Sequence, residues 1–247
     1  KYYNALDENG SVKMKYHQHN GMGRHWTSSG YGIQNMWKKV RHTVCKDIYY
    51  DIDMKNAHPT LLSFYCNNNN IPCEALDDYI TNRDECLREF MEHHDCTKDS
   101  AKAEYLAVLN GGKPTLNSTE RFNTFVQGVS VIHNSIAEFE PELMTMAKES
   151  KVKQGKRDYN INGTCTNYVM CDLENKTLMA MCDFFKRKKV TVGALAFHGL
   201  MILKEDVNKE DLPRLLAECM IHIKGAIGAD ITVLEKPMND GADPIDW

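Results

Sequence analysis

Two patterns of hydrophobic positions alternate along this chain. Segments in which every second residue is apolar, or in which a short apolar run is bounded by turn residues, predict strands. They occur at 11–19 ("SVKMKYHQH"), at 47–54 ("DIYYDIDM"), as a hairpin at 190–204 and at 229–236 ("ADITVLEK"). Apolar spacing of three and four residues predicts helices between about 75 and 150, at 168–188 and at 208–226. Strands therefore flank a helical insertion.

This order predicts an α+β fold rather than alternating strand–helix units. The strands before and after the insertion are expected to form one antiparallel sheet, and the helices between them a second lobe. We place the first part of the sheet domain at 1–74, the helical insertion at 75–160 and the second part of the sheet domain at 161–247.

Composition narrows the class of protein only a little. With 247 residues, 42% of them hydrophobic and 26% charged, the chain can bury a substantial core. A net charge of −4 gives no overall attraction to nucleic acid, so a polyanion site needs a local cluster such as 186–189 ("KRKK"). The alternative for that run is a solvated helix end.

The cysteines and the hydropathy profile indicate an intracellular protein without a membrane span. Nine cysteines are scattered and never spaced C-x-x-C, which indicates neither a disulfide framework nor a zinc knuckle. No apolar run approaches the roughly 18 residues that a transmembrane helix needs. We therefore expect a reducing, cytoplasmic location and no membrane partner.

Candidate chemistry begins at the end of the second predicted strand. Asp51 and Asp53 are two residues apart, so a strand points both carboxylates to one face of the sheet. Carboxylates held in this way are typical ligands of Mg²⁺, which keeps water and substrate phosphates in its remaining positions. A solvated strand end is the alternative, because D-x-D alone is common.

The surrounding motifs resemble those of family A (DNA polymerase I-like) DNA polymerases. The segment "GMGRHWTSSGYGIQNMWKKVRHTV" followed by "DIDMKNAHPTLL" is similar to the family pattern T-G-R-x-S-S, L-Q-N, I-R, D-Y-S-Q-I-E-L-R. The fingers signature R-x3-K-x7-Y-G corresponds to Lys98, Lys102, Asn110 and Gly111. The resemblance covers nearly the whole chain and is closest to the compact branch found in viruses and mobile elements.

The resemblance implies a polymerase palm (1–74 and 161–247), helical fingers (75–160) and a role for each matching residue. Asp53 corresponds to the first metal ligand, and Lys98 and Lys102 to residues that hold the nucleotide triphosphate. Asn110 and Gly111 replace the family Tyr-Gly near the templating base, and His58 is a candidate for sugar selection or a helix-start histidine. The residues expected to face DNA are Arg24, Gln34, Asn35, Arg41, Glu174 and Asn175.

The hairpin turn "AFHG" departs from the family at the second metal ligand. His198 stands where the family has an aspartate, and an imidazole suits softer ions than Mg²⁺. Asp51 is then the nearest carboxylate that could supply the missing ligand. A turn histidine in a hairpin without catalytic function is the alternative.

Together these features predict a template-directed DNA polymerase that adds dNTPs to a primer with Mg²⁺ or Mn²⁺ and is impaired at His198. Its expected partners are primer–template DNA, dNTPs and other replication domains or proteins, in the host cell if the chain is viral. The alternative is a catalytically silent, polymerase-like module that binds nucleic acid in a replication complex.

Overall fold

The computed structural model describes residues 3–8, 11–28, 30, 32–115, 118–239 and 241. The chain divides into two compact units, one of 1–57 with 172–247 and one of 58–171. The division falls within one long helix, α8 (Ile161–Arg187), and at the start of another, α2 (Ala57–Asn68). The assignment of 75–160 as polymerase fingers stays a prediction.

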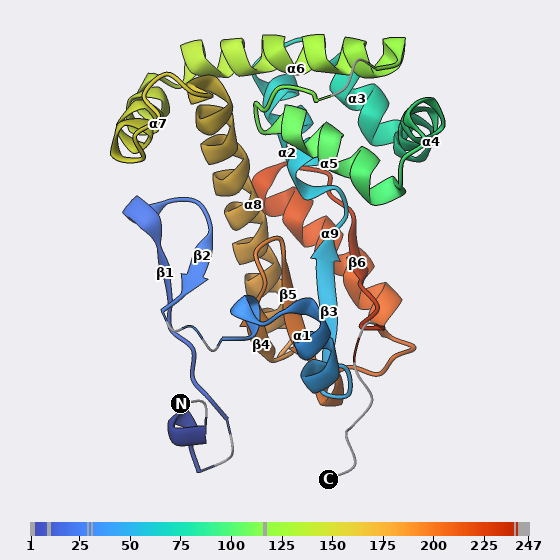
Figure 1. The fold of residues 1–247 in the computed structure, drawn as a ribbon. Helices are drawn as coiled ribbons and strands as arrows, with labels where there is room; N and C mark the ends of the chain where they lie inside the picture. Colours follow the sequence, from blue (N-terminus) through green and yellow to red (C-terminus); the bar gives the residue numbers. More distant parts are fainter. Residues whose placement is uncertain are drawn as a thin grey trace. The chain divides into compact units, whose positions relative to one another are not determined.

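The first unit is built on an antiparallel sheet of four strands in the order β4-β5-β3-β6 (Figure 1). Its central strand is β3, and β5 and β6 pair with its two edges. A separate hairpin, β1-β2, lies nearer the N-terminus. The strands are β1 (Tyr16–Gln18), β2 (His25–Thr27), β3 (Tyr49–Met54), β4 (Val192–Leu195), β5 (Gly199–Leu203) and β6 (Val233–Glu235).

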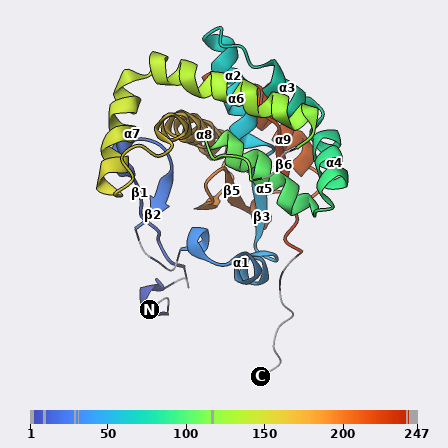
Figure 2. The same ribbon diagram turned by 45° about the horizontal axis from the view of Figure 1, so that its top comes forward.

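Helices cover both faces of this sheet. Helix α1 (Lys38–Cys45) lies on one side, and α9 (Leu212–Ile227) with the C-terminal part of α8 lies on the other (Figures 1 and 2). On the α1 side, Cys45 packs with Ala194 and Met201. The opposite face of β3 and β5 is apolar, and Ile52, the residue of β3 that anchors it, is fully buried. The described residues of this unit also include four short 3-10 helices: η1 (Tyr3–Ala5), η2 (His19–Gly21), η3 (Ile33–Asn35) and η4 (Lys204–Asp206).

The second unit consists of helices around an aromatic core. Besides α2 and the start of α8 these are α3 (Glu74–Thr81), α4 (Arg83–His94), α5 (Lys98–Leu109), α6 (Glu120–Phe139) and α7 (Pro141–Lys153). The rings of Tyr79 and Tyr105 stack with centroids 4.5 Å apart, and Phe122 meets Tyr105 edge to face at 4.8 Å. These rings are buried, so this segment has a hydrophobic core of its own.

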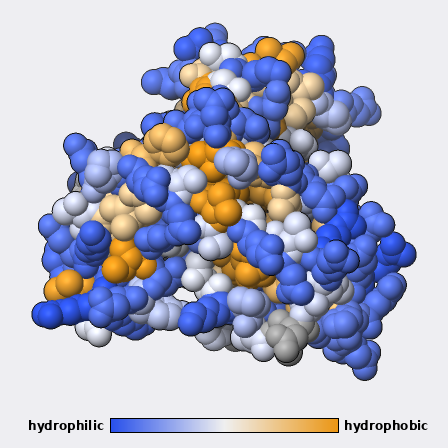
Figure 3. Space-filling view, turned by 90° about the horizontal axis from the view of Figure 1, so that it is seen from above, coloured by the Kyte–Doolittle hydropathy of each residue, from blue (hydrophilic) through white to orange (hydrophobic). Residues whose placement is uncertain are grey.

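The face of the molecule shown in Figure 3 is mostly hydrophilic, and hydrophobic residues show in patches between the hydrophilic ones. Within the described part of the chain, no helix has the length and hydropathy needed to cross a bilayer.

Candidate active site

The two strand aspartates lie on the α1 face of the sheet. Asp53 is opposite Gly199 and Asp51 opposite Met201 in the antiparallel register of β3 and β5, and residues that face each other across a pair point the same way. Asp51 is buried, whereas the side chain of Asp53 is 15% exposed. The sheet therefore presents Asp53 to ligands and holds Asp51 behind it.

A tight turn delivers His198 to Asp53. Residues 196–199 close the β4-β5 hairpin, with Ala196 N donating to Gly199 O at 2.8 Å. Phe197 has a φ of 59°, the left-handed conformation that such turns require. Gly199 has no room for a side chain, because a Cβ there would lie 2.4 Å from the carbonyl oxygen of Ile52. The backbone thus fixes His198 directly above the end of β3.

His198 bridges two carboxylates. Its Nε2 lies 3.3 Å from Asp53 Oδ1 and its Nδ1 lies 3.6 Å from Glu174 Oε1. The hydrogen bond with Glu174 and the negative charge of Asp53 raise the pKa of His198 above its usual value, although burial opposes this. His198 thus connects the carboxylate at the end of β3 with the carboxylate on α8.

Helix α8 places Glu174 beside His198 in this cluster. Glu174 is fully buried and accepts two hydrogen bonds from Arg24, from Nε at 2.6 Å and from an Nη at 3.2 Å. Beside it, Asn175 Oδ1 lies 2.5 Å from His25 Nδ1. Residues 24 and 25, at the start of β2, are therefore bonded to adjacent residues of α8. Arg24 also lies over the ring of Phe197 in the turn.

Lys236 completes the surroundings of Asp53. Its Nζ donates to Asp53 Oδ2 at 3.0 Å, and its backbone N donates to Asp51 O at 2.7 Å. Both oxygens of Asp53 thus contact basic side chains, Lys236 on one and His198 on the other. Sequence reasoning missed Lys236; the only signal was its place at the end of a strand predicted to join the same sheet.

The surroundings of Asp51 change the pKa of its carboxyl group. Burial and the negative charge of Asp53 raise its pKa, while Lys236, Arg41 and His198 act in the opposite direction. The cluster is therefore a balanced set of acidic and basic groups, with Asp53 as its most accessible carboxylate.

These donors fit one divalent cation better than two. Mg²⁺ prefers oxygen ligands, and Asp53 supplies them, with Asp51 on the same face as a further oxygen donor. His198 adds an imidazole, which is accepted more readily by Mn²⁺ and softer ions. Glu174 is already bonded to Arg24. A second cation of the kind used in two-metal sites would lack a carboxylate of its own.

The residues expected to face DNA divide into two groups. Gln34 is buried, and its amide bonds inside the protein to Thr27 N at 3.1 Å and His25 O at 2.8 Å, so we assign it to positioning the 25–27 strand. Glu174 and Asn175 are likewise buried and bonded to Arg24 and His25. Asn35 is exposed and Arg41 is half-buried, and DNA contact by these two residues and Arg24 stays a prediction.

The predicted nucleotide-binding residues lie in the second unit. Lys98 and Lys102 lie on the first two turns of α5, where they pair with Asp84 at 2.7 Å and Asp99 at 3.3 Å. Asn110 ends α5, and Gly111, with a φ of 77°, lies so close to Gly163 that a Cβ would be 2.7 Å from its Cα. Their contact with a nucleotide stays a prediction.

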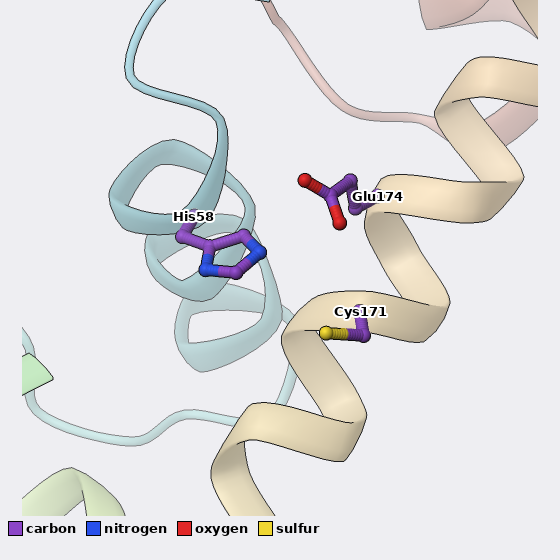
Figure 4. A group of neighbouring side chains, drawn as sticks. All are labelled: His58, Cys171 and Glu174. Atoms are coloured by element: carbon purple, nitrogen blue, oxygen red, sulfur yellow. The ribbon is translucent and has the colours of Figure 1, made fainter. Parts of the chain in front are cut away.

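His58 begins the second unit at the first turn of α2. Within this unit a ring nitrogen of His58 lies within 4.8 Å of the thiol sulfur of Cys171. Figure 4 shows the side chains of Cys171 and Glu174 one turn apart on α8, together with His58 on α2. An imidazole and a thiol are two donors, fewer than a structural zinc site needs.

Comparisons with known proteins give a sequence relative and solved structures of similar fold. The chain is 32% identical over 249 residues to the "Putative helicase V13" of Sputnik virophage, covering 94% of this chain and 31% of that protein. The chain thus spans about a third of the length of this relative. No model of a known protein family matches the chain.

One solved structure with a similar fold is the polymerase domain of Pol1 from M. smegmatis in complex with DNA primer–template and dNTP. The two folds superpose with a TM-score of 0.64 at 10% sequence identity, over 97% of this chain and 50% of the other. The chain therefore has the fold of a DNA polymerase domain, and the predicted α+β class, with an antiparallel sheet and a helical insertion, is confirmed.

Proposed function

We propose that this chain is a template-directed DNA polymerase domain of the family A type, with weakened metal binding. One observation carries the proposal: in a polymerase-like fold, His198 in a hairpin turn lies 3.3 Å from Asp53 at the end of the adjacent strand. In the family this hairpin position is an aspartate that binds a catalytic metal.

The proposed reaction transfers a nucleotidyl group from a dNTP to a primer 3′ end. A divalent cation, when bound, would neutralise charge that develops on the phosphoryl oxygens. Asp53 and His198, with Asp51 beside them, would hold that cation. Arg24 keeps Glu174 oriented toward His198, so the arrangement of the cluster is fixed before a substrate arrives.

Lys98 and Lys102 are proposed to hold the triphosphate. Lysines four apart on a helix share one face and act on phosphates as point charges. The Asp84 and Asp99 carboxylates that pair with them are 87% and 93% exposed, and exposed pairs contribute only about 0–1 kcal/mol. A phosphate can therefore replace these carboxylates at little cost.

Primer extension tests the proposal. Wild type is expected to extend a primer slowly with Mg²⁺ and faster with Mn²⁺, and His198→Asp is expected to raise the Mg²⁺-dependent rate at least tenfold. The gain should disappear in the Asp53→Asn, His198→Asp double variant, which serves as the matched control. If His198→Asp is as inactive as Asp53→Asn with both metals, the polymerase proposal is wrong.

A second candidate function is supported by the cations around Asp53. Because His198 and Lys236 already occupy its two oxygens, the cluster is stable without any metal, as a nucleic-acid-binding module without catalysis would be. This module would bind primer–template with unchanged affinity in the Asp53→Asn variant and extend it in no variant. Primer–template affinity measured beside extension separates the two functions.

The cellular context is also a proposal. The virophage relative supports a viral or mobile-element origin and action in an infected host cell. The relative is named a helicase, and the chain spans about a third of it, so we propose that this domain works beside further replication domains.

A further inference from the structure

The helical unit holds a cavity of about 560 Å³ that takes no part in the proposed reaction. Helices α3, α4, α5 and α6 all contribute to its lining (Figure 1). Its buried wall is mainly aromatic, because Tyr79, Tyr105 and Phe125 line it and each is at most 2% exposed. The volume of the cavity is within the range of small-ligand sites.

Negative charge dominates this cavity. Its lining contains the carboxylates of Glu74, Asp78, Glu89 and Glu120 and a single cation, Arg121. The Arg121 guanidinium donates two bonds of 2.7 Å to Asp78 and one of 3.2 Å to Glu89. In the described part of the chain, the carboxylates of Glu74 and Glu120 have no ion-pair partner. Carboxylates thus outnumber cations in the lining by three.

The arginines just outside the lining do not remove this excess. Arg83 donates to the hydroxyl oxygen of Tyr79 at 3.2 Å, and Arg88 pairs with Glu85 at 3.7 Å. Glu85 also contacts Arg121 at 3.4 Å, so it adds a further carboxylate beside these two cations. The cavity and its immediate surroundings therefore remain negative.

One polar group in the buried wall has no partner in the protein. Tyr105 lines the cavity and is only 1% exposed, and its hydroxyl makes no hydrogen bond with any residue that the structure describes. The threonine hydroxyls of the lining are satisfied, since Thr119 accepts from Phe122 N and Thr124 donates to Glu120 O. An unpaired buried hydroxyl costs free energy, which a ligand with an N–H group can recover.

The groups of the lining indicate which kind of ligand fits. No three of these carboxylates bring their oxygens within 4.8 Å of one another, so they do not match a single metal ion. An ammonium or guanidinium group supplies several N–H donors at a larger spacing, and aromatic rings attract such cations. Arg121 already shows that carboxylates of this cavity bind a guanidinium.

We propose that this cavity binds an organic cation, namely an ammonium or guanidinium group on an apolar stem. The stem would contact the aromatic wall, and the cationic group would bond to the Tyr105 hydroxyl and to the unpaired carboxylates of Glu74 and Glu120. A basic side chain of another protein and a free polyamine share this chemistry. The site lies entirely within 74–125 and is independent of the proposed polymerase function.

The test is a titration of the isotope-labelled full chain with spermidine and, separately, with an arginine–glycine peptide of the same charge. Binding is followed by the nuclear magnetic resonance shifts of the backbone amides. Amides of 119–125, which line the cavity, should shift until they saturate. Affinity should fall at high salt, because screening weakens the attraction of exposed carboxylates for a cation.

Two variants examine the proposed contacts. Tyr105→Phe removes only the unpartnered hydroxyl, so it should keep the thermal stability of wild type and lower the affinity for the cation about tenfold or more. The Glu74→Gln, Glu120→Gln variant should lower the affinity about fivefold, as expected for exposed charges. The matched control, Glu142→Gln with Glu149→Gln, removes two exposed carboxylates from α7 of the same unit and should bind as wild type.

The two probes distinguish the source of the cation. Tighter binding of spermidine supports the site and identifies a free polyamine, whereas tighter binding of the peptide supports it and identifies a protein side chain. The proposal is overturned if neither probe shifts the amides of 119–125, or if both cavity variants bind as tightly as wild type. Equal losses in the glutamate variant and in its α7 control would indicate general charge attraction and would also overturn it. Should Tyr105→Phe fail to fold, the glutamate variant and this control carry the test.

Discussion

At the scale of single residues, the chain neutralises its own candidate metal ligand. Asp53 contacts Lys236 at 3.0 Å, so an incoming cation competes with the Lys236 ammonium group for this carboxylate. A site built in this way should bind metal weakly even though a carboxylate is available. The affinity for metal is expected to be low because of the groups around Asp53, and not because Asp53 is a poor ligand.

Lys236→Met is expected to tighten Mn²⁺ binding. The Lys236 side chain is 43% exposed, so its pair with Asp53 is worth at most about 1 kcal/mol, which corresponds to about fivefold in affinity. Titration of free Mn²⁺ by electron paramagnetic resonance measures the effect. Lys224→Met, which breaks an exposed pair with Asp230, should change nothing. Unchanged affinity in Lys236→Met would mean that Lys236 does not compete with the metal.

The histidine His133 is expected to make the stability of the protein depend on pH. His133 is buried, its Nε2 lies 3.1 Å from the carbonyl oxygen of Leu109, and burial lowers its pKa. The unfolded chain therefore takes up a proton near pH 6.5 before the folded chain does, so the free energy of unfolding falls as the pH drops below about 6.5.

Urea unfolding at pH 7.5 and 5.5 checks this expectation. His133→Gln keeps an amide donor for Leu109 O and does not titrate, so it should lose less stability at pH 5.5 than wild type. The difference cannot exceed about 1.4 kcal/mol per pH unit for one proton. Parallel pH profiles for the two proteins would contradict the assignment.

At the scale of elements, the β4-β5 hairpin is fixed by close approach to β3. Gly199 lies opposite Asp53, and a methyl group there would meet both the carbonyl oxygen of Ile52 and an oxygen of Asp53. The glycine thus allows the backbones to pair where the candidate metal ligands converge.

Gly199→Ala is expected to destabilise the protein by about 1–3 kcal/mol, as other overpacked sites do. Gly225 offers a matched control, because it lies inside α9 and a methyl group added there would have nothing within 4 Å, so Gly225→Ala should stabilise the helix by about 0.5–1 kcal/mol. Urea midpoints of the two variants should therefore move in opposite directions. A neutral Gly199→Ala would indicate that β3 and β5 can separate without cost.

A comparison of the predicted with the observed strands and helices shows which of them the sequence could reveal. The strands at 47–54 and in the 190–204 hairpin were predictable because their apolar residues and turn residues are local signals. Helix α8 begins at Ile161 rather than 168, although Gly163 and Thr164 are poor helix formers. Thr164 compensates by bonding back to Asn160 O at 2.7 Å, and Gly163 allows the close approach to Gly111.

The site was predictable in part for a similar reason. Asp53 and His198 lie in recognisable motifs, and the structure brings them together. The bonds of Arg24 to Glu174 and of Lys236 to Asp53 join residues 150 and 183 positions apart, and no local pattern reports them. The motif that contains Gln34 likewise did not reveal that this side chain is buried and accepts a hydrogen bond from Thr27 N.

At the scale of the whole molecule, the helical unit is continuous in sequence and the sheet unit is not. Residues 58–171 form one unit with its own aromatic core, whereas the sheet unit combines 1–57 with 172–247. A segment that buries its own core can fold independently of the chain around it.

The fragment 58–171 is therefore expected to fold alone. Circular dichroism should show a helical spectrum and one cooperative thermal transition. Phe122→Ala in the same fragment removes a fully buried ring at a cost of about 3–5 kcal/mol and should abolish the transition. A fragment without helical signal would mean that its helices depend on the sheet unit.

The central position of β3 has a consequence for synthesis of the protein. Both strands that pair with it, β5 and β6, lie beyond the entire helical unit in the chain. At about 5–20 residues per second, a ribosome leaves β3 with two open edges for on the order of ten seconds while the helices already condense. An unpaired, apolar strand can pair with a strand of another chain and so start aggregation. We therefore expect the nascent chain to need a chaperone during this interval.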